Sequence, residues 1–211
     1  MASEGSVPPT LGAILAGGLA RRLGGGDKAL RTVGGRTVLA RIVERVSLQV
    51  RSLIINANDD PARFDEFGLP VVADSLPDHP GPLAGVLAAL EWAIRSDPGM
   101  VWVLTVPGDA PFLPRDLVSR MHTERERRGA AFACAASKGR SHPVVALWPV
   151  SVRDELRQAV AYDGVRRLDA FTKGRVAEVE WSAIPADPFF NLNAPDDLME
   201  ANCLARAHPD L

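Results

Sequence analysis

Hydrophobic and polar positions follow two patterns that alternate along most of the chain. Short apolar runs are typical of strands that are buried on both faces, and longer stretches with apolar residues at helical spacing are typical of helices. Between 37 and 50, Thr37 stands where a helix cap is expected, before an apolar face made of Val38, Leu39, Ile42, Val43 and Val46. The short runs predict strands at 11–15, 52–56, 70–73, 100–106, 130–136, 143–148 and 175–181. The spaced stretches predict helices at 37–50, 61–67, 82–94, 114–128, 151–160, 165–173 and 194–207.

Strands that alternate with helices predict βαβ units and therefore an α/β fold. We expect three α/β/α layers around a mostly parallel, Rossmann-like sheet. At about 150 residues per domain, the 211 residues make a single domain, which we expect to span 11–211 after a flexible tail at 1–10. Ligands bind at the carboxyl ends of parallel strands. The loops after Leu15, Asn56 and Val106 should therefore converge on one site.

Charge and cysteine content exclude several classes of protein. Lys and Arg number 24 and Asp and Glu number 26, a net charge of −2, which argues against a nucleic-acid binder. No apolar stretch reaches the ~18 residues of a membrane span. The apolar run 11–20 follows Glu4 and precedes Arg21, the wrong charge order for an export signal. Cys134 and Cys203 stand far apart and form no metal motif, so we expect a cytoplasmic protein.

A glycine-rich loop with three cations follows the first predicted strand. Its sequence from Leu15 to Lys28 is LAGGLARRLGGGDK, with Arg21 and Arg22 in the middle. Glycines let backbone N–H groups approach an anion closely, so the loop suits a phosphate. It is neither a Walker A loop nor a dinucleotide fingerprint, because Asp27 precedes the lysine and the glycine spacing differs. The alternative is a flexible turn with solvated cations.

A second candidate element is the turn VPGDAPF at 106–112, which places Asp109 just beyond a buried strand. Mg²⁺ takes one or two carboxylates together with phosphate oxygens and water. Asp109 beside a phosphate loop therefore suggests a magnesium site. The alternative is an aspartate that only caps a turn.

Five segments, in order, carry a resemblance to a known family. They are LAGGLARRLGGGDKAL, LIINAN, ADSLPDHPGPLAG, VPGDAPFL and NLNAPDDL, spread over 11–204. Together they resemble the molybdenum cofactor guanylyltransferases, a branch of the sugar-phosphate-type nucleotidyltransferases. The resemblance implies transfer of GMP from GTP to the phosphate of the molybdopterin cofactor, with release of pyrophosphate. The attacking phosphate oxygen is already ionised at neutral pH, which fits the absence of a nucleophilic His or Cys constellation.

The resemblance also implies roles for individual residues. It implies Mg²⁺ as the cofactor, held by Asp109 with Asn193 beside it, and places Lys28 at the GTP phosphates. The expected catalytic residues are Lys28, Asp109 and Arg22, of which Arg22 is chosen for its positive charge rather than from the resemblance. The residues expected to bind GTP are Leu15, Ala16, Gly17, Gly18, Lys28, Asn56, Asp74 and Asp109. The GTP and Mg²⁺ half is expected at about 11–112 and the molybdopterin half at about 113–211.

Five further residues are candidates for the molybdopterin side of the site. They are Gly81, Pro82, His142, Arg166 and Asn191. Each has a structural alternative: a rigid turn into a helix for the Gly-Pro pair, a capping or surface role for the histidine, and a solvent-facing position for the arginine.

Two other functions compete with this interpretation. One is a related nucleotidyltransferase that uses CTP or another phosphate acceptor. The other is a non-catalytic nucleotide-binding partner of a molybdoenzyme, against which Lys28 and Asp109 argue. The expected partners are GTP, the molybdopterin cofactor and a molybdoenzyme chaperone or molybdopterin-handling protein, with no nucleic acid and no membrane.

Overall fold

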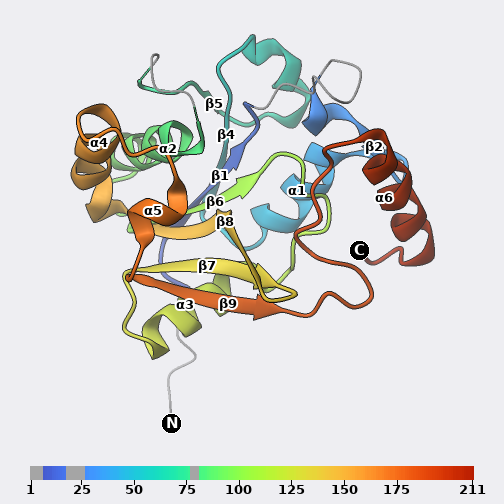
Figure 1. The fold of residues 1–211 in the computed structure, drawn as a ribbon. Coiled ribbons are helices and arrows are strands. Elements are labelled where there is room, and N and C mark those ends of the chain that lie inside the picture. The colour runs from blue at the N-terminus through green and yellow to red at the C-terminus, as the bar shows by residue number, and fades with distance from the viewer. Residues whose placement is uncertain (1–6, 18–26, 77–80) are drawn as a thin grey trace.

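The computed structural model describes residues 7–17, 27–76 and 81–211. Within these ranges, seven strands form one sheet in the order β5-β4-β1-β6-β8-β7-β9 (Figure 1). β8 runs antiparallel to β6 and β7, and the other neighbouring strands are parallel. The expected mostly parallel sheet is confirmed. The strands are β1 (Thr10–Leu15), β4 (Ser52–Asn56), β5 (Val71–Val72), β6 (Trp102–Pro107), β7 (Phe132–Ser137), β8 (Arg140–Pro149) and β9 (Val176–Trp181).

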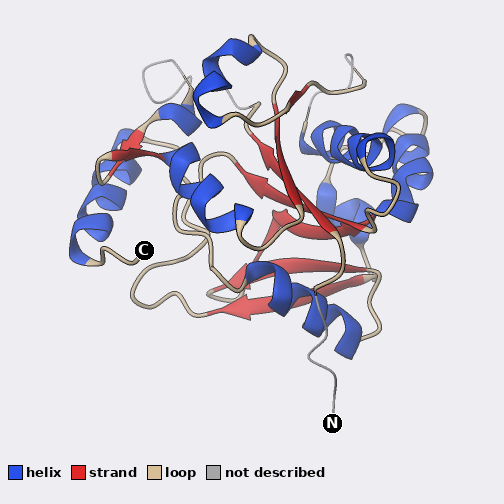
Figure 2. Cartoon of the chain, turned by 180° about the vertical axis from the view of Figure 1, so that it is seen from behind, coloured by secondary structure: helices blue, strands red, loops and turns tan. Residues whose placement is uncertain are grey.

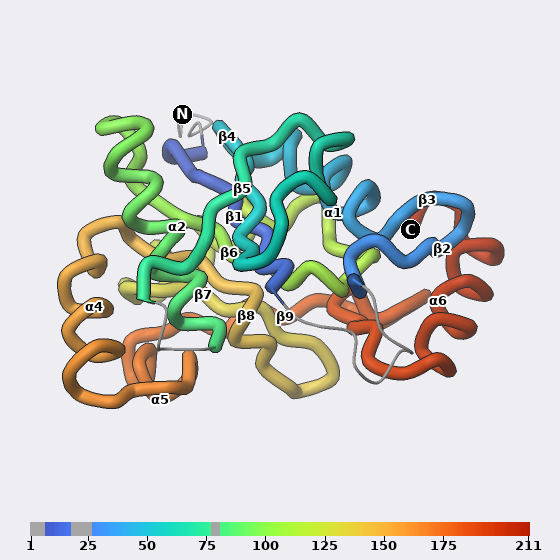
Figure 3. Tube along the Cα trace, turned by 90° about the horizontal axis from the view of Figure 1, so that it is seen from above, coloured from blue at the N-terminus to red at the C-terminus, as the bar shows by residue number. Residues whose placement is uncertain are grey.

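Helices cover both faces of this sheet, as Figures 2 and 3 show. One face packs against α2 (Pro82–Ser96), α4 (Arg153–Ala161) and α5 (Leu168–Thr172), whose apolar side chains form one buried cluster. The opposite cluster includes buried residues of α1 (Val38–Ser47), α3 (Leu117–Arg127) and α6 (Pro195–Ala207). The predicted three-layer α/β/α architecture is therefore confirmed.

The first long helix forms for the local reasons that its sequence indicates. The Thr37 hydroxyl oxygen accepts a hydrogen bond from the Ala40 backbone N–H at 3.2 Å, which caps the helix. Val38, Leu39 and Ile42 are fully buried against the sheet. The helix ends at Ser47, three residues before the predicted end at Val50.

Other boundaries differ from the predictions where turns interrupt the pattern. A hairpin that was not predicted, β2 (Thr32–Val33) with β3 (Arg36–Thr37), lies before α1. Its turn residues Gly34 and Gly35 have φ values of +58° and +81°, which glycine adopts without strain. The helix predicted at 165–173 is shortened to α5, because the Val165 N–H donates to the Ala159 carbonyl at 2.9 Å and Arg167 is extended at φ −108° and ψ 134°. The remaining short helices are η2 (Lys28–Leu30), η3 (Pro61–Phe67) and η4 (Val150–Val152).

An irregularity in β8 brings the second half of the chain to the site. The register against β7 shifts between Cys134, which pairs with Ala146, and Ala135, which pairs with His142. Residues 143–145 therefore have no partner in β7. The buried Thr105 hydroxyl donates to the Val144 carbonyl at 2.8 Å and accepts from the Trp148 indole at 3.0 Å, which holds this bulge in place.

Two further expectations concern the chain ends and membranes. Residues 1–6 of the predicted tail lie outside the described residues, and Thr10 already belongs to β1. Among the described helices, none is long and apolar enough to cross a bilayer.

Candidate functional site

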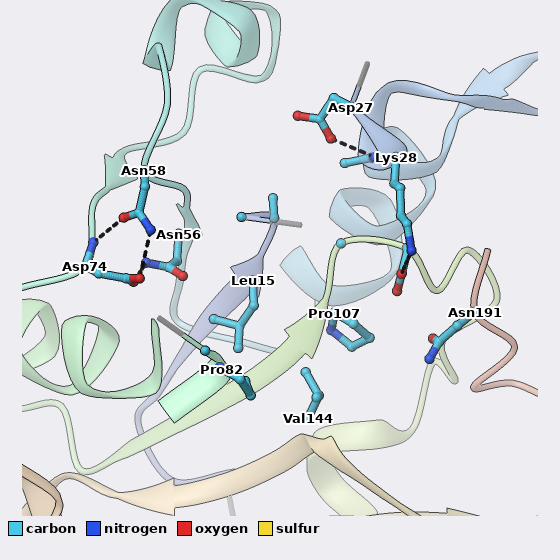
Figure 4. A pocket seen from close by; sticks show the side chains of 16 residues that line it. Leu15, Asp27, Lys28, Asn56, Asn58, Asp74, Pro82, Pro107, Val144 and Asn191 are labelled. Carbon is cyan, nitrogen blue, oxygen red and sulfur yellow. Dashed lines mark hydrogen bonds and ion pairs between the residues drawn. The ribbon is translucent and has the colours of Figure 1, made fainter. Parts of the chain in front are cut away.

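The carboxyl ends of β1, β4 and β6 meet at one edge of the sheet. Leu15 pairs with Asn56 on one side and with Pro107 on the other, so the predicted convergence of the three loops is confirmed. They surround a cavity of about 480 Å³ (Figure 4). It is lined by Leu15, Ala16, Gly17, Asp27, Lys28, Ala29, Asn56, Asn58, Asp74, Gly81, Pro82, Pro107, Gly108, Asp109, Val144 and Asn191.

Close packing between two backbones builds the floor of this cavity. The Gly108 N–H donates to the Leu15 carbonyl at 2.9 Å, and the Ala16 N–H donates to the Asn56 carbonyl at 2.9 Å. A Cβ at position 108 would lie 3.1 Å from the Ala16 Cα and 3.2 Å from the Leu15 carbonyl oxygen. Only glycine fits between these loops without displacing backbone.

At one end of the cavity, the Lys28 ammonium group joins two distant loops. It donates to the Asn193 side-chain oxygen at 2.8 Å and to the Asp109 carboxylate at 3.3 Å. Burial raises the pKa of Asp109, and the charge and hydrogen bond of Lys28 act against that rise. The Leu192 N–H donates to the Asp109 carbonyl at 3.0 Å, which ties the loop before α6 to the end of β6.

Local capping fixes the approach of Lys28. The Asp27 carboxylate accepts from the Ala29 N–H at 2.9 Å and caps η2, whose first residue is Lys28. The other carboxylate oxygen of Asp27 lies 3.4 Å from the Arg63 Nε atom. Asp27 therefore holds the backbone at Lys28 in place, from which the lysine side chain extends to Asp109 and Asn193.

The oxygen atoms around Lys28 are suitable ligands for a divalent cation. A carboxylate and an amide oxygen are the hard donors that Mg²⁺ and Mn²⁺ prefer. Within the described ranges, no group of three or more His, Cys, Asp and Glu side chains could enclose a metal. The residues therefore fit an ion that takes most of its ligands from phosphates and water.

At the other end of the cavity, two asparagines surround an aspartate. Asn56 donates to one Asp74 carboxylate oxygen at 2.9 Å, and Asn58 donates to the other at 2.8 Å. Figure 4 shows this group across the cavity from Lys28. Lys28 is the one cation among the described residues that line the cavity. The two ends therefore differ chemically, with a lysine beside a carboxylate at one and a carboxylate between two amides at the other.

The structure brings most of the predicted site residues together. Ten of them line the cavity: Leu15, Ala16, Gly17, Lys28, Asn56, Asp74, Gly81, Pro82, Asp109 and Asn191. Asn193 is not a lining residue, but its side-chain oxygen accepts a hydrogen bond from Lys28, which is one. Gly18 and Arg22 lie outside the described residues.

Two candidates for the molybdopterin side do not line this cavity. The His142 Nε2 atom lies 2.8 Å from the Ser137 hydroxyl, which in turn donates to the Asp187 carboxylate at 2.9 Å. Asp187 also accepts from the Phe189 N–H at 3.0 Å, so this network anchors the loop that leads to Asn191. Arg166 donates to the Val160 carbonyl at 2.9 Å. Both residues contact protein groups rather than the cavity.

Asp27, Asn58 and Val144 were missed by the sequence analysis. The signal for Asn58 was available, because it follows the β4 strand end by two residues. Val144 could not be found from local sequence, because the bulge in β8 is what turns it to the cavity.

Comparison with known proteins agrees with this geometry. A family model described as the MobA-like NTP transferase domain matches residues 12–178. A molybdenum cofactor guanylyltransferase from Nitrobacter hamburgensis is 54% identical over 200 residues, which cover 94% of this chain and 96% of that protein. A protein of the same name from Rhizobium meliloti is 43% identical over 205 residues, which cover 94% and 92% of the two chains.

Solved structures share the fold. Molybdopterin-guanine dinucleotide biosynthesis protein A from Archaeoglobus fulgidus matches with a TM-score of 0.70 at 22% identity, covering 93% of this chain and 99% of that one. The manganese complex of Rv0371c from Mycobacterium tuberculosis matches with a TM-score of 0.66 at 16% identity, covering 93% and 98%.

Proposed function

Because the chain belongs to the MobA-like NTP transferase family, we propose that it is a molybdenum cofactor guanylyltransferase. The reaction moves GMP from GTP to the phosphate of the molybdopterin cofactor. An acceptor phosphate oxygen attacks the α-phosphorus of GTP and forms a new P–O bond. The bond from the α-phosphorus to the bridging oxygen breaks, and pyrophosphate leaves with that oxygen and its electron pair.

The observation that carries this proposal is the placement of Lys28 between Asp109 and Asn193, across the cavity from Asp74. A triphosphate needs cations at one end of its site, and a nucleoside needs hydrogen-bonding groups at the other. The barrier to phosphoryl transfer is mainly the approach of two anions and the charge on the leaving group, so positioning and electrostatics suffice.

Each residue then has a defined task. The Lys28 ammonium binds the phosphates and neutralises the leaving pyrophosphate. The backbone of Leu15, Ala16 and Gly17 contacts the nucleotide, and Asn56 and Asp74 belong to the nucleoside end. Asp109 and Asn193 would hold Mg²⁺, which, when bound, stabilises negative charge on the reacting phosphates. On the loop outside the described residues, Gly18 is proposed as a further nucleotide contact and Arg22 as a second catalytic cation.

The acceptor would enter from the side built by the second half of the chain. Gly81, Pro82 and Asn191 line the same cavity and are proposed to face the molybdopterin. His142 would act on this side through the loop that it anchors, and Arg166 stays a candidate for the acceptor phosphate. The free cysteines Cys134 and Cys203 support a reducing cytoplasm as the place of reaction. A molybdoenzyme chaperone would be the next partner.

The decisive experiment incubates the protein with GTP, Mg²⁺ and the molybdopterin cofactor, and measures pyrophosphate and the guanine dinucleotide product. We expect both products in equal amounts, and none with Asp109→Asn. CTP in place of GTP tests the alternative nucleotide. Turnover with CTP alone, or nucleotide binding without any pyrophosphate release, would overturn the proposal. Mn²⁺ in place of Mg²⁺ shows which ion the site prefers.

A further inference from the structure

Asn58 and Asp74 form a closed pair of hydrogen bonds. The Asp74 backbone N–H donates to the Asn58 side-chain oxygen at 2.8 Å, and the Asn58 amide donates back to the Asp74 carboxylate at 2.8 Å. Asn58 follows β4 and Asp74 follows β5, so the pair joins two loops at the edge of the sheet. Two bonds in opposite directions fix both the position and the rotation of the carboxylate.

Asn56 also donates a hydrogen bond to the Asp74 carboxylate. Its amide donates to the Val72 carbonyl at 3.0 Å and to the second Asp74 oxygen at 2.9 Å, which uses both of its N–H groups. The side-chain oxygen of Asn56 lies close to Gly85 of α2, where an added Cβ would come within 2.4 Å of that oxygen. Asn56 is 5% exposed. Both N–H groups of Asn56 are therefore committed to protein contacts, and Asp74 is the neighbouring group with acceptor positions for the donors of a ligand.

The remaining acceptor sites of Asp74 define the ligand chemistry. A carboxylate has two oxygens with about four acceptor positions. Among the described residues, the two asparagines occupy one position on each oxygen. One position per oxygen stays free on a residue that lines the cavity. Two adjacent free acceptors match two adjacent donors, which the N1–H and 2-amino groups of guanine provide and which the other common bases lack.

We propose that Asn58 is a positioning residue that aligns the Asp74 carboxylate with the N1–H and 2-amino edge of guanine. This inference rests on the proposed function, because it assumes that the nucleoside lies at this end of the cavity. Asn58 acts through Asp74 and sets selectivity for the base rather than the rate of phosphoryl transfer. A site built to bind two donors discriminates against an analogue that lacks one of them.

Binding of GTP, ITP and 2′-deoxy-GTP, measured by isothermal titration calorimetry, tests the proposal. ITP lacks only the 2-amino group, so the wild-type protein should bind GTP at least roughly tenfold more tightly than ITP. Asn58→Ala should weaken GTP binding by about tenfold and bring the GTP to ITP ratio close to one. In turnover assays it should raise KM for GTP and leave kcat within about threefold. Asn58 is exposed, so the variant is expected to fold.

A matched control is Asn202→Ala, because Asn202 also accepts from a backbone N–H, that of Gly34, and donates to backbone carbonyls, but does not line the cavity. It should keep the wild-type ratio. An unchanged ratio in Asn58→Ala overturns the inference, as does a wild-type protein that binds GTP and ITP equally. A loss specific to 2′-deoxy-GTP would place the ribose at Asp74 and also overturn it. If the wild-type protein binds no guanine nucleotide, the proposed function itself fails.

Discussion

The ammonium nitrogen of Lys28 lies 2.8 Å from the side-chain oxygen of Asn193, a residue 165 positions further along the chain. This contact joins the phosphate loop to the segment that precedes α6. The Asn193 backbone N–H donates to the Asp197 carboxylate at 2.7 Å, so the start of α6 holds the asparagine in place. The described part of the phosphate loop and the C-terminal helix thus meet at the reacting end of the cavity.

Removal of the lysine charge should abolish most activity without unfolding the protein. We expect Lys28→Met to lower kcat/KM for guanylyl transfer by about 100-fold or more, because a positioned cation at the leaving phosphates is lost. The side chains of Lys28 and Asp109 are only 18% and 20% exposed, so the variant leaves a largely buried carboxylate without its cation and should lose about 1–3 kcal/mol of stability while still folding. The control is Lys138→Met, whose amine lies 3.7 Å from Asp187 and is 66% exposed. A loss under threefold in Lys28→Met would contradict the assigned role.

A methyl group at position 108 should push the two central loops apart. Gly108→Ala places a Cβ within 3.2 Å of Ala16 and of the Leu15 carbonyl, and backbone must give way. We expect a loss of about 1–3 kcal/mol in stability, together with a fall in kcat/KM. Gly99→Ala is the control, because its nearest neighbour is the movable Asp97 carboxylate at 3.2 Å. Thermal melts and steady-state rates of both variants measure these effects. Wild-type stability and kcat/KM in Gly108→Ala would contradict the prediction, because they would show that the two loops accommodate a Cβ.

One buried histidine should make stability depend on pH. His122 is 4% exposed, and its Nε2 atom lies 3.0 Å from the Thr10 hydroxyl. Burial, with Arg125 nearby, lowers the pKa of His122 to about 4. Below about pH 6.5 the unfolded chain is protonated there while the folded chain is not. The free energy of unfolding should therefore fall by up to about 3 kcal/mol as the pH drops from 6.5 to 4.

Urea titrations of the wild-type protein and His122→Gln across this pH range measure the difference. The variant should show a flatter pH dependence, since glutamine does not titrate. His208→Gln, close to the C-terminal end of the chain, serves as the control and should keep the wild-type slope. Equal slopes for all three proteins would mean that His122 takes up its proton over the same pH range in the folded and unfolded chains.

The two cysteines should differ sharply in reactivity. Cys203 is exposed on α6, whereas Cys134 is buried in β7, where burial raises the pKa of its thiol to about 12. Since the thiolate is the reactive form, iodoacetamide at pH 8 should modify the native protein once, at Cys203. Mass spectrometry after digestion identifies the site. Cys203→Ser should remain unlabelled until denaturant exposes Cys134, and rapid native labelling of that variant would contradict the burial.

Local sequence determined the seven strands of the main sheet, most of the helices, the Thr37 cap and the loops that carry Lys28, Asp74 and Asp109, but not the β2–β3 hairpin. These features follow from periodicity, capping and the rule that parallel strands deliver their ends to one edge, all of which act over short distances. The meeting of these loops could also be expected, because each follows a predicted parallel strand, and the structure confirms it by pairing Leu15 with Asn56 and with Pro107.

Only the tertiary structure decided which side chains of these loops contact one another. The bond of Lys28 to Asn193, the Asn58–Asp74 pair and the entry of Val144 through the bulge all depend on long-range packing and on side-chain direction. His142 shows the same limit, because its partners Ser137 and Asp187 draw it into an anchoring network. Spacing along a chain specifies which residues reach an edge, but hydrogen-bond partners are chosen by the three-dimensional arrangement of donors and acceptors there.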